Sequence, residues 1–182
     1  MRNVFFIHGV GSDGTENWFP WLKRRLELLG CNVIVPRFPT PANQTLKNWL
    51  AILERYKSHI TPDSIFVGHS LGVAFLLNIL ETTRAKAAFF VAGVSGPLDN
   101  EFDDSMKTFS HRKFDWDKIR NNCRRFYIFH SDDDPYIPLP EAEKLAQNLH
   151  VDLILVKGAG HINESAGYTK FDLLLENIKK EL

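Results

Sequence analysis

The sequence predicts an α/β domain in which a mostly parallel sheet carries helices on both faces. Short β-branched or aromatic runs alternate with segments of helical period along the 182 residues. These runs are apolar at consecutive positions, which is typical of strands covered on both faces. Reactive residue types directly follow several of the runs, and ligands of open parallel sheets bind beyond the carboxyl ends of the strands. We therefore expect one domain over residues 1–182, with its functional site at that edge.

The strands and helices are predicted from this alternation. The six predicted strands cover residues 3–7, 32–36, 64–68, 87–93, 125–130 and 151–156. The predicted helices cover residues 17–29, 45–60, 70–81, 140–149 and 168–181. Gly30 is a stop signal for the first helix, and Pro62 prevents continuation of the second. The connection 94–114 is the one long segment without a predicted element, and it is too short for a full lid domain.

Charge and composition argue against several classes of partner. The 22 Lys and Arg residues balance 22 Asp and Glu residues, so there is no global attraction to nucleic acid or to an anionic membrane. No stretch reaches the roughly 20 apolar residues of a membrane helix, and the start MRNVFFIHGV lacks the features of a signal peptide. We expect a cytoplasmic monomer whose Cys31 and Cys123 are free, packed thiols.

The segment GHSLG, residues 68–72, matches the nucleophile-elbow pattern G-x-S-x-G. The pattern alone is weak, but here the apolar run SIFV precedes it and an apolar helix follows, as the elbow requires. The sharp turn would lift the Ser70 hydroxyl clear of the sheet and place it at a helix N-terminus, which favours negative charge. Ser70 is therefore the predicted nucleophile, in preference to an inert turn serine.

A serine nucleophile needs a base, and the base needs an acid to orient it. His161 follows the last predicted strand through a Gly-Ala-Gly turn that could bring its imidazole toward Ser70. The acid must come from SDDDPYIP after the fifth strand, which agrees with the chain order Ser, Asp, His. We favour Asp134, with Asp133 as the alternative and Asp132 less favoured, and expect the unused aspartates to cap turns. The spacing of this acidic run does not fit a calcium loop, so no metal site is expected.

An oxyanion hole would complete such a site. One donor is expected to be the backbone N–H of Leu71, which follows the nucleophile. The other is expected to be the N–H of Val10, in the loop HGVG after the first strand.

The same loop can be interpreted as a nucleotide-binding turn. Its glycines, Gly9, Gly11 and Gly14, have the spacing G-x-G-x-x-G of a dinucleotide fingerprint. That site also requires an acid near the end of the second strand, and IVPRFP contains none. We therefore expect no nucleotide and no other cofactor.

The segments HGVGSDGTENWFPWLKRRLE, VGHSLG, SDDDPYIP and GAGHIN resemble the small serine hydrolases related to retinoblastoma-binding protein 9. This family is a compact branch of the α/β-hydrolase fold without a large lid. The resemblance implies a three-layer α/β fold with a six-stranded sheet of order 2-1-3-4-5-6, and a triad of Ser70, Asp134 and His161. Binding to retinoblastoma protein is not implied, because LGCNV (29–33) has Val33 where the Leu-x-Cys-x-Glu motif needs Glu.

We therefore predict a cofactor-independent serine hydrolase that cleaves small ester or amide acyl substrates through an acyl-enzyme. Gly9, Trp18 and His69 are expected near the substrate, although Trp18 could equally be a helix-packing residue, and the connection 94–114 is expected to wall the acyl pocket. A catalytically idle binding module with the same fold is the alternative from another class. Acyl transfer and thioester cleavage remain open within the enzyme class.

Overall fold

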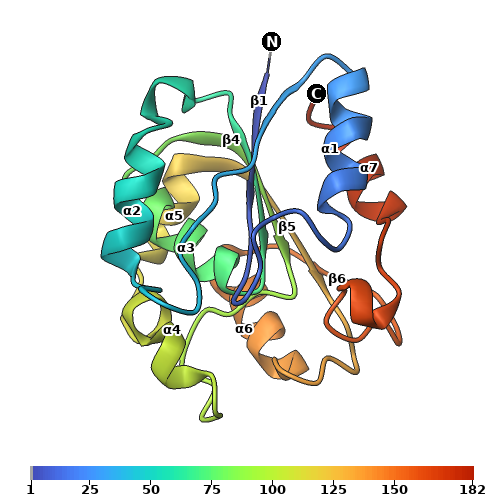
Figure 1. The fold of residues 1–182 in the computed structure, drawn as a ribbon. Coiled ribbons are helices and arrows are strands. Elements are labelled where there is room, and N and C mark those ends of the chain that lie inside the picture. The colour runs from blue at the N-terminus through green and yellow to red at the C-terminus, as the bar shows by residue number, and fades with distance from the viewer. Residues whose placement is uncertain (1) are drawn as a thin grey trace.

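The computed structural model describes residues 2–182 and contains a six-stranded parallel sheet of order β2-β1-β3-β4-β5-β6 (Figure 1). This is the predicted strand order. The strands are β1 (Asn3–Ile7), β2 (Asn32–Ile34), β3 (Ile65–His69), β4 (Ala85–Val91), β5 (Cys123–His130) and β6 (Leu153–Leu155). Because all pairs are parallel, their carboxyl ends lie along one edge, at the bottom of Figure 1.

Both faces of the sheet are buried, which explains the continuous apolar runs. In β1, Phe5 and Ile7 point into one hydrophobic cluster, whereas Val4 and Phe6 point into the other. All four side chains are fully buried. A strand whose alternate side chains both enter a core must be apolar at every position.

The helices form the two outer layers (Figure 1). On one face lie α1 (Phe19–Leu28) and α7 (Asp172–Lys179), which contribute to the cluster around Phe6. The other face is covered by α2 (Leu46–Glu54), α3 (Leu71–Leu80), α4 (Asp103–Ser110), α5 (Trp116–Asn122) and α6 (Leu139–Leu149). All ten residues of α3 are buried, as its nearly all apolar sequence predicts.

The structure differs from the prediction most clearly in three helical segments, one of which is α5, a helix where none was expected. The helix expected over 45–60 ends at Glu54 and is followed by a short 3-10 helix, Lys57–His59. The connection 94–114 contains α4, whose Met106 and Phe109 enter the core. A hydrogen bond of 2.9 Å from Asn78 Nδ2 in α3 to the Phe109 carbonyl oxygen holds α4 against the sheet layer.

Two further expectations concern the chain as a whole. No helix within residues 2–182 is long and apolar enough to cross a membrane. Cys31 and Cys123 are both free and buried.

Candidate active site

Ser70 lies in a strained turn between β3 and α3. Its backbone has φ 56° and ψ −122°, a conformation that L-residues rarely adopt. The flanking glycines make the turn sterically feasible. A Cβ atom on Gly72 would lie 2.3 Å from the Ile7 carbonyl oxygen, and one on Gly68 would lie 2.8 Å from Leu76 Cδ1. The glycines of GHSLG are therefore required by close packing, and the turn leaves Ser70 partly exposed.

The loop after β1 passes directly beside Ser70. A Cβ atom on Gly9 would lie 2.8 Å from Ser70 Cβ, so only glycine allows this approach. The next residue, Val10, lines the same cavity as Ser70. Within residues 2–182, the backbone N–H groups of Val10 and Leu71 donate no hydrogen bond. Both donors are therefore available to a ligand.

His161 and Asp134 form a buried hydrogen-bonded pair. Nδ1 of His161 lies 2.8 Å from Oδ2 of Asp134, whose side chain is fully buried. Burial alone would raise the pKa of the Asp134 carboxyl. The hydrogen bond and charge of His161, together with the backbone N–H groups of Tyr136 and Ile137, outweigh burial and lower this pKa below its usual value. Asp134 is therefore an ionised acceptor that fixes the imidazole.

The two neighbouring aspartates support the turn that carries His161. Oδ1 of Asp132 accepts from the Gly158 N–H at 2.8 Å, and Oδ1 of Asp133 accepts from the Gly160 N–H at 2.8 Å. Both glycines have positive φ angles, 64° and 52°, which explains the Gly-Ala-Gly sequence. The unused aspartates were expected to cap their own turn through local bonds, but these bonds reach the backbone of a distant loop. Of the three aspartates, only Asp134 is hydrogen-bonded to the imidazole.

Ser70 and His161 line one cavity but are not hydrogen-bonded to each other. Within residues 2–182, Ser70 Oγ makes no hydrogen bond, whereas the His161–Asp134 bond is formed. Such contacts between nucleophile and base are often long in enzymes without substrate and tighten in the substrate complex. The structure thus brings the three residues to one sheet edge and joins two of them directly.

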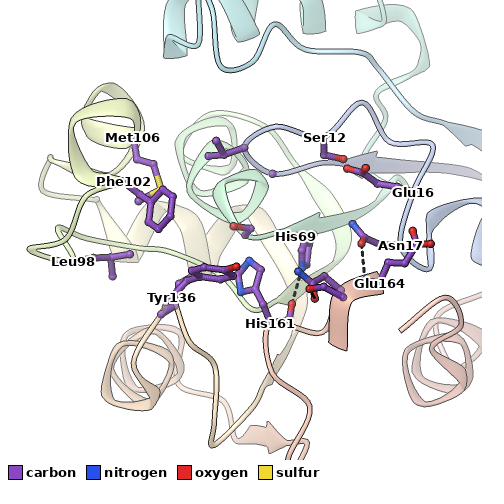
Figure 2. A pocket seen from close by; sticks show the side chains of 16 residues that line it. Ser12, Glu16, Asn17, His69, Leu98, Phe102, Met106, Tyr136, His161 and Glu164 are labelled. Atoms are coloured by element: carbon purple, nitrogen blue, oxygen red, sulfur yellow. Dashed lines mark hydrogen bonds between the residues drawn. The ribbon is translucent and has the colours of Figure 1, made fainter. Parts of the chain in front are cut away.

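His69 connects the nucleophile turn to the His161 loop. Its Nε2–H donates to the His161 carbonyl oxygen at 3.0 Å (Figure 2). Burial, followed by the nearby charge of His161, lowers the pKa of His69 to about 3. His69 is therefore neutral at physiological pH, with its proton on Nε2 and an acceptor lone pair on Nδ1.

The expectation that Trp18 contacts substrate is wrong. Its indole is completely buried and does not line the cavity. Nε1–H donates to the Ile162 carbonyl oxygen at 2.9 Å, and the ring packs edge-on against His69 at 5.9 Å between centroids. The ring is directed inward at the start of α1 by this packing. Trp18 therefore supports the His161 loop from behind.

The cavity around Ser70 has a volume of about 420 Å³ and two chemically different halves (Figure 2). One half is apolar and comes mainly from the segment that contains α4 and from the loop after β5: Leu98, Phe102, Met106, Tyr136 and Ile137. The other half is polar and comes from the loops after β1 and β6: Ser12, Glu16, Asn17, Asn163, Glu164 and Ser165. Gly9 and His69 also line the cavity, as expected from the sequence. Within residues 2–182 there is no cluster of three side chains able to hold a metal ion.

The comparison with family models matches residues 4–180 to the serine hydrolase family. The chain belongs to the serine hydrolase family. Its curated relatives include YdeN of Bacillus subtilis, 29% identical over 99% of this chain and 98% of the relative. They also include the serine hydrolase RBBP9 of Rattus norvegicus, 28% identical over 96% of this chain and 91% of the relative. The family resemblance seen in the sequence is thus confirmed.

Solved structures of other proteins show the same fold. The crystal structure of the B. subtilis ydeN gene product has a TM-score of 0.91 and 28% identity, covering 100% of this chain and 98% of that one. Est1E from Butyrivibrio proteoclasticus has a TM-score of 0.74 at 15% identity, covering 99% of this chain and 88% of that one. The α/β-hydrolase fold predicted for this serine hydrolase is therefore confirmed.

The sequence did not identify several cavity residues of this serine hydrolase. Phe102 and Met106 are spaced four residues apart and could have indicated a helix with an apolar face. Glu16 and Glu164 belong to no recognisable motif. They line one cavity because the loops after β1 and β6 lie together, joined by a hydrogen bond of 2.8 Å from the Glu164 N–H to Asn17 Oδ1. Only the three-dimensional arrangement shows that these loops meet.

Proposed function

We propose that this serine hydrolase cleaves small-molecule esters through an acyl-enzyme formed on Ser70, with His161 as base and Asp134 as its orienting acid. The observation that carries this proposal is the 2.8 Å contact between His161 Nδ1 and Asp134 Oδ2, beside a strained serine on the same cavity. A functional nucleophile explains why the chain keeps the Ser70 strain. The family match supports hydrolysis in general.

Acylation begins when Ser70 Oγ attacks the substrate carbonyl carbon and His161 Nε2 takes the hydroxyl proton. The negative charge then moves to the carbonyl oxygen, which the N–H groups of Val10 and Leu71 stabilise. Collapse of this intermediate breaks the bond to the leaving group, and His161 Nε2 donates the proton to the departing oxygen. Loss of one oxyanion donor typically slows such a reaction by about 10²–10³-fold.

Deacylation repeats these steps with water in place of Ser70. His161 Nε2 takes a proton from the water, whose oxygen attacks the acyl carbon. When the bond from the acyl carbon to Ser70 Oγ breaks, His161 Nε2 returns the proton to Ser70 Oγ. The products are a carboxylic acid and the free enzyme. Asp134 stays ionised throughout and stabilises the imidazolium, as its lowered pKa favours. These steps require only the substrate and water.

The apolar half of the cavity supports an acyl chain of moderate length. Phe102 and Met106 of the α4 segment and Tyr136 of the loop after β5 form its wall. The Tyr136 ring packs edge-on against Phe102 at 5.6 Å and against His161 at 5.0 Å between centroids. This wall contacts the imidazole itself, so an acyl chain there would lie close to the reacting atoms.

A panel of p-nitrophenyl esters with increasing chain length tests the proposal. We expect wild-type hydrolysis with an optimum at short to medium chains, and no hydrolysis above background by Ser70→Ala. Ser165→Ala is the matched control, because Ser165 lines the same cavity. Equal activity of wild type and Ser70→Ala, or inactivity of folded wild type toward every ester, would refute the proposal.

A further inference from the structure

The polar half of the cavity has a distinct electrostatic character. Its two charged side chains are the carboxylates of Glu16 and Glu164, and neither Lys nor Arg lines the cavity. Figure 2 places both glutamates on the side opposite Phe102 and Met106. The cavity that Ser70 lines is thus apolar at one end and anionic at the other.

The two glutamate side chains have no structural partner. Within residues 2–182, neither carboxylate forms an ion pair or a hydrogen bond. Other groups make the polar contacts of these loops. Asn17 Oδ1 accepts from the Glu164 N–H. Asn163 Oδ1 accepts from the Ala166 N–H and from the Ser165 hydroxyl. The carboxylates of Glu16 and Glu164 are therefore not needed to shape the loops.

A buried acceptor lies at the inner end of the same half. His69 is only 5% exposed and lines the cavity, and its Nδ1 accepts no hydrogen bond within residues 2–182. Within residues 2–182, His130 Nδ1 is the fully buried side-chain N or O atom that lacks a partner, so His69 Nδ1 keeps some exposure, and Figure 2 shows the His69 side chain on the side of Asn17 and Glu164. Because His69 is neutral with its proton on Nε2, it offers this lone pair beside Ser70.

We propose that the polar half is a subsite for a cationic group, an ammonium, on the leaving-group side of the substrate. Two unpaired carboxylates and an acceptor nitrogen complement positive charge and oppose a carboxylate or phosphate. The apolar half then holds the acyl chain. This inference rests on the proposed function, because it assigns the two ends of the substrate of that same site.

The position of His161 supports this orientation. The leaving group departs next to His161 Nε2, which must protonate it. Asn163, Glu164 and Ser165 follow His161 closely in the chain and line the polar half. His69 binds the His161 backbone from that same half. A leaving group protonated by His161 can therefore reach the glutamates, while the side of the imidazole that faces Tyr136 is left to the acyl chain.

A pair of thioesters tests the subsite. Butyrylthiocholine carries a trimethylammonium group, and 3,3-dimethylbutyl thiobutyrate is its neutral isostere with carbon in place of nitrogen. The acyl group and the leaving sulfur atom are the same in both thioesters. The ammonium group also makes its thiol a better leaving group, but this effect is the same for every variant, so the change in the kcat/KM ratio between wild type and a variant reports recognition of the charge. Release of thiol is measured for wild type, Ser70→Ala, the double variant Glu16→Gln/Glu164→Gln, and the control Glu101→Gln, whose exposed carboxylate does not line the cavity.

We expect the kcat/KM ratio of the cationic to the neutral thioester to be about tenfold higher in wild type than in the double variant. The ratio should stay unchanged in Glu101→Gln, and in wild type it should decrease with added salt because the carboxylates are exposed. Hydrolysis of the neutral thioester should persist in the double variant, which shows that fold and nucleophile are intact. A ratio that the double variant preserves would overturn the subsite and leave the proposed function standing. Absence of Ser70-dependent hydrolysis of both thioesters would overturn the subsite alone if the p-nitrophenyl esters are still hydrolysed, and the two proposals together if they are not.

Discussion

Replacing Asp134 by Asn tests the triad with little change in shape. The Asn carbonyl oxygen can still accept from the N–H groups of Tyr136 and Ile137, which lie 2.9 Å and 3.1 Å from Asp134 Oδ1. The Asn amide would then face His161 Nδ1 as a donor, in place of the acceptor Oδ2 at 2.8 Å. The imidazole must move its proton to Nε2, where it can no longer accept the proton of Ser70.

The expected loss in kcat is large. The same substitution in a well-studied triad enzyme lowers kcat by about 10⁴-fold. This corresponds to about 5.4 kcal/mol of transition-state stabilisation, since a tenfold change in rate equals about 1.36 kcal/mol. The assay is p-nitrophenyl butyrate hydrolysis, with circular dichroism to verify that Asp134→Asn is folded.

Asp133→Asn is the matched control. The Asn carbonyl oxygen can keep the 2.8 Å bond from the Gly160 N–H, and only the charge is lost. A weakened hydrogen bond of this kind costs about 1 kcal/mol, so the rate should fall by less than about tenfold. The reasoning fails if folded Asp134→Asn keeps more than a tenth of wild-type kcat, or if Asp133→Asn loses as much as Asp134→Asn.

Three further predictions concern the supporting residues. Gly72→Ala should lower the free energy of unfolding, measured in urea, by about 1–3 kcal/mol, because the new Cβ atom would lie 2.3 Å from a β1 carbonyl oxygen. The control Gly96→Ala should be nearly neutral, because the nearest atom to its new Cβ lies at 3.8 Å. Equal effects of the two substitutions would contradict this prediction. His69→Gln can keep the hydrogen bond to the His161 carbonyl oxygen. The substitution removes an imidazole whose pKa is lowered by burial from 6.5 to about 3. In the unfolded chain this histidine gains a proton below about pH 6.5, whereas His69 in the folded protein stays neutral. The free energy of unfolding of wild type should therefore decrease more steeply from pH 6.5 to 3 than that of His69→Gln. Parallel plots of this free energy against pH would refute the prediction. Phe102→Ala should shift the ester optimum to longer chains and Trp18→Phe should not, because only Phe102 lines the cavity; a shift in both would place Trp18 at the substrate.

The layers could be predicted because burial on both sheet faces requires continuous apolar strands, as Phe5 and Phe6 of β1 illustrate. The strand order came from the family resemblance and not from the apolar pattern. Helix α4 was not predicted, although Phe102, Met106 and Phe109 have helical spacing. The surrounding segment is polar and rich in turn residues, and α4 is stabilised by tertiary contacts such as the bond from Asn78 to the Phe109 carbonyl.

The site could be predicted in part for a similar reason. The elbow at Ser70 has a local signature, since its glycines are needed by local sterics. The choice among three adjacent aspartates depends on which carboxylate points at His161, and this is set by how two loops meet. Trp18 illustrates the same limit, because a sequence places it near the site without indicating that its ring points inward.

Peptide mapping after reaction with a fluorophosphonate probe tests the central claim most directly. The account predicts one adduct, on the peptide that contains Ser70, in wild type, and none in folded Ser70→Ala. An adduct on another residue, or folded wild type that stays unlabelled, would contradict the claim that Ser70 is an activated nucleophile.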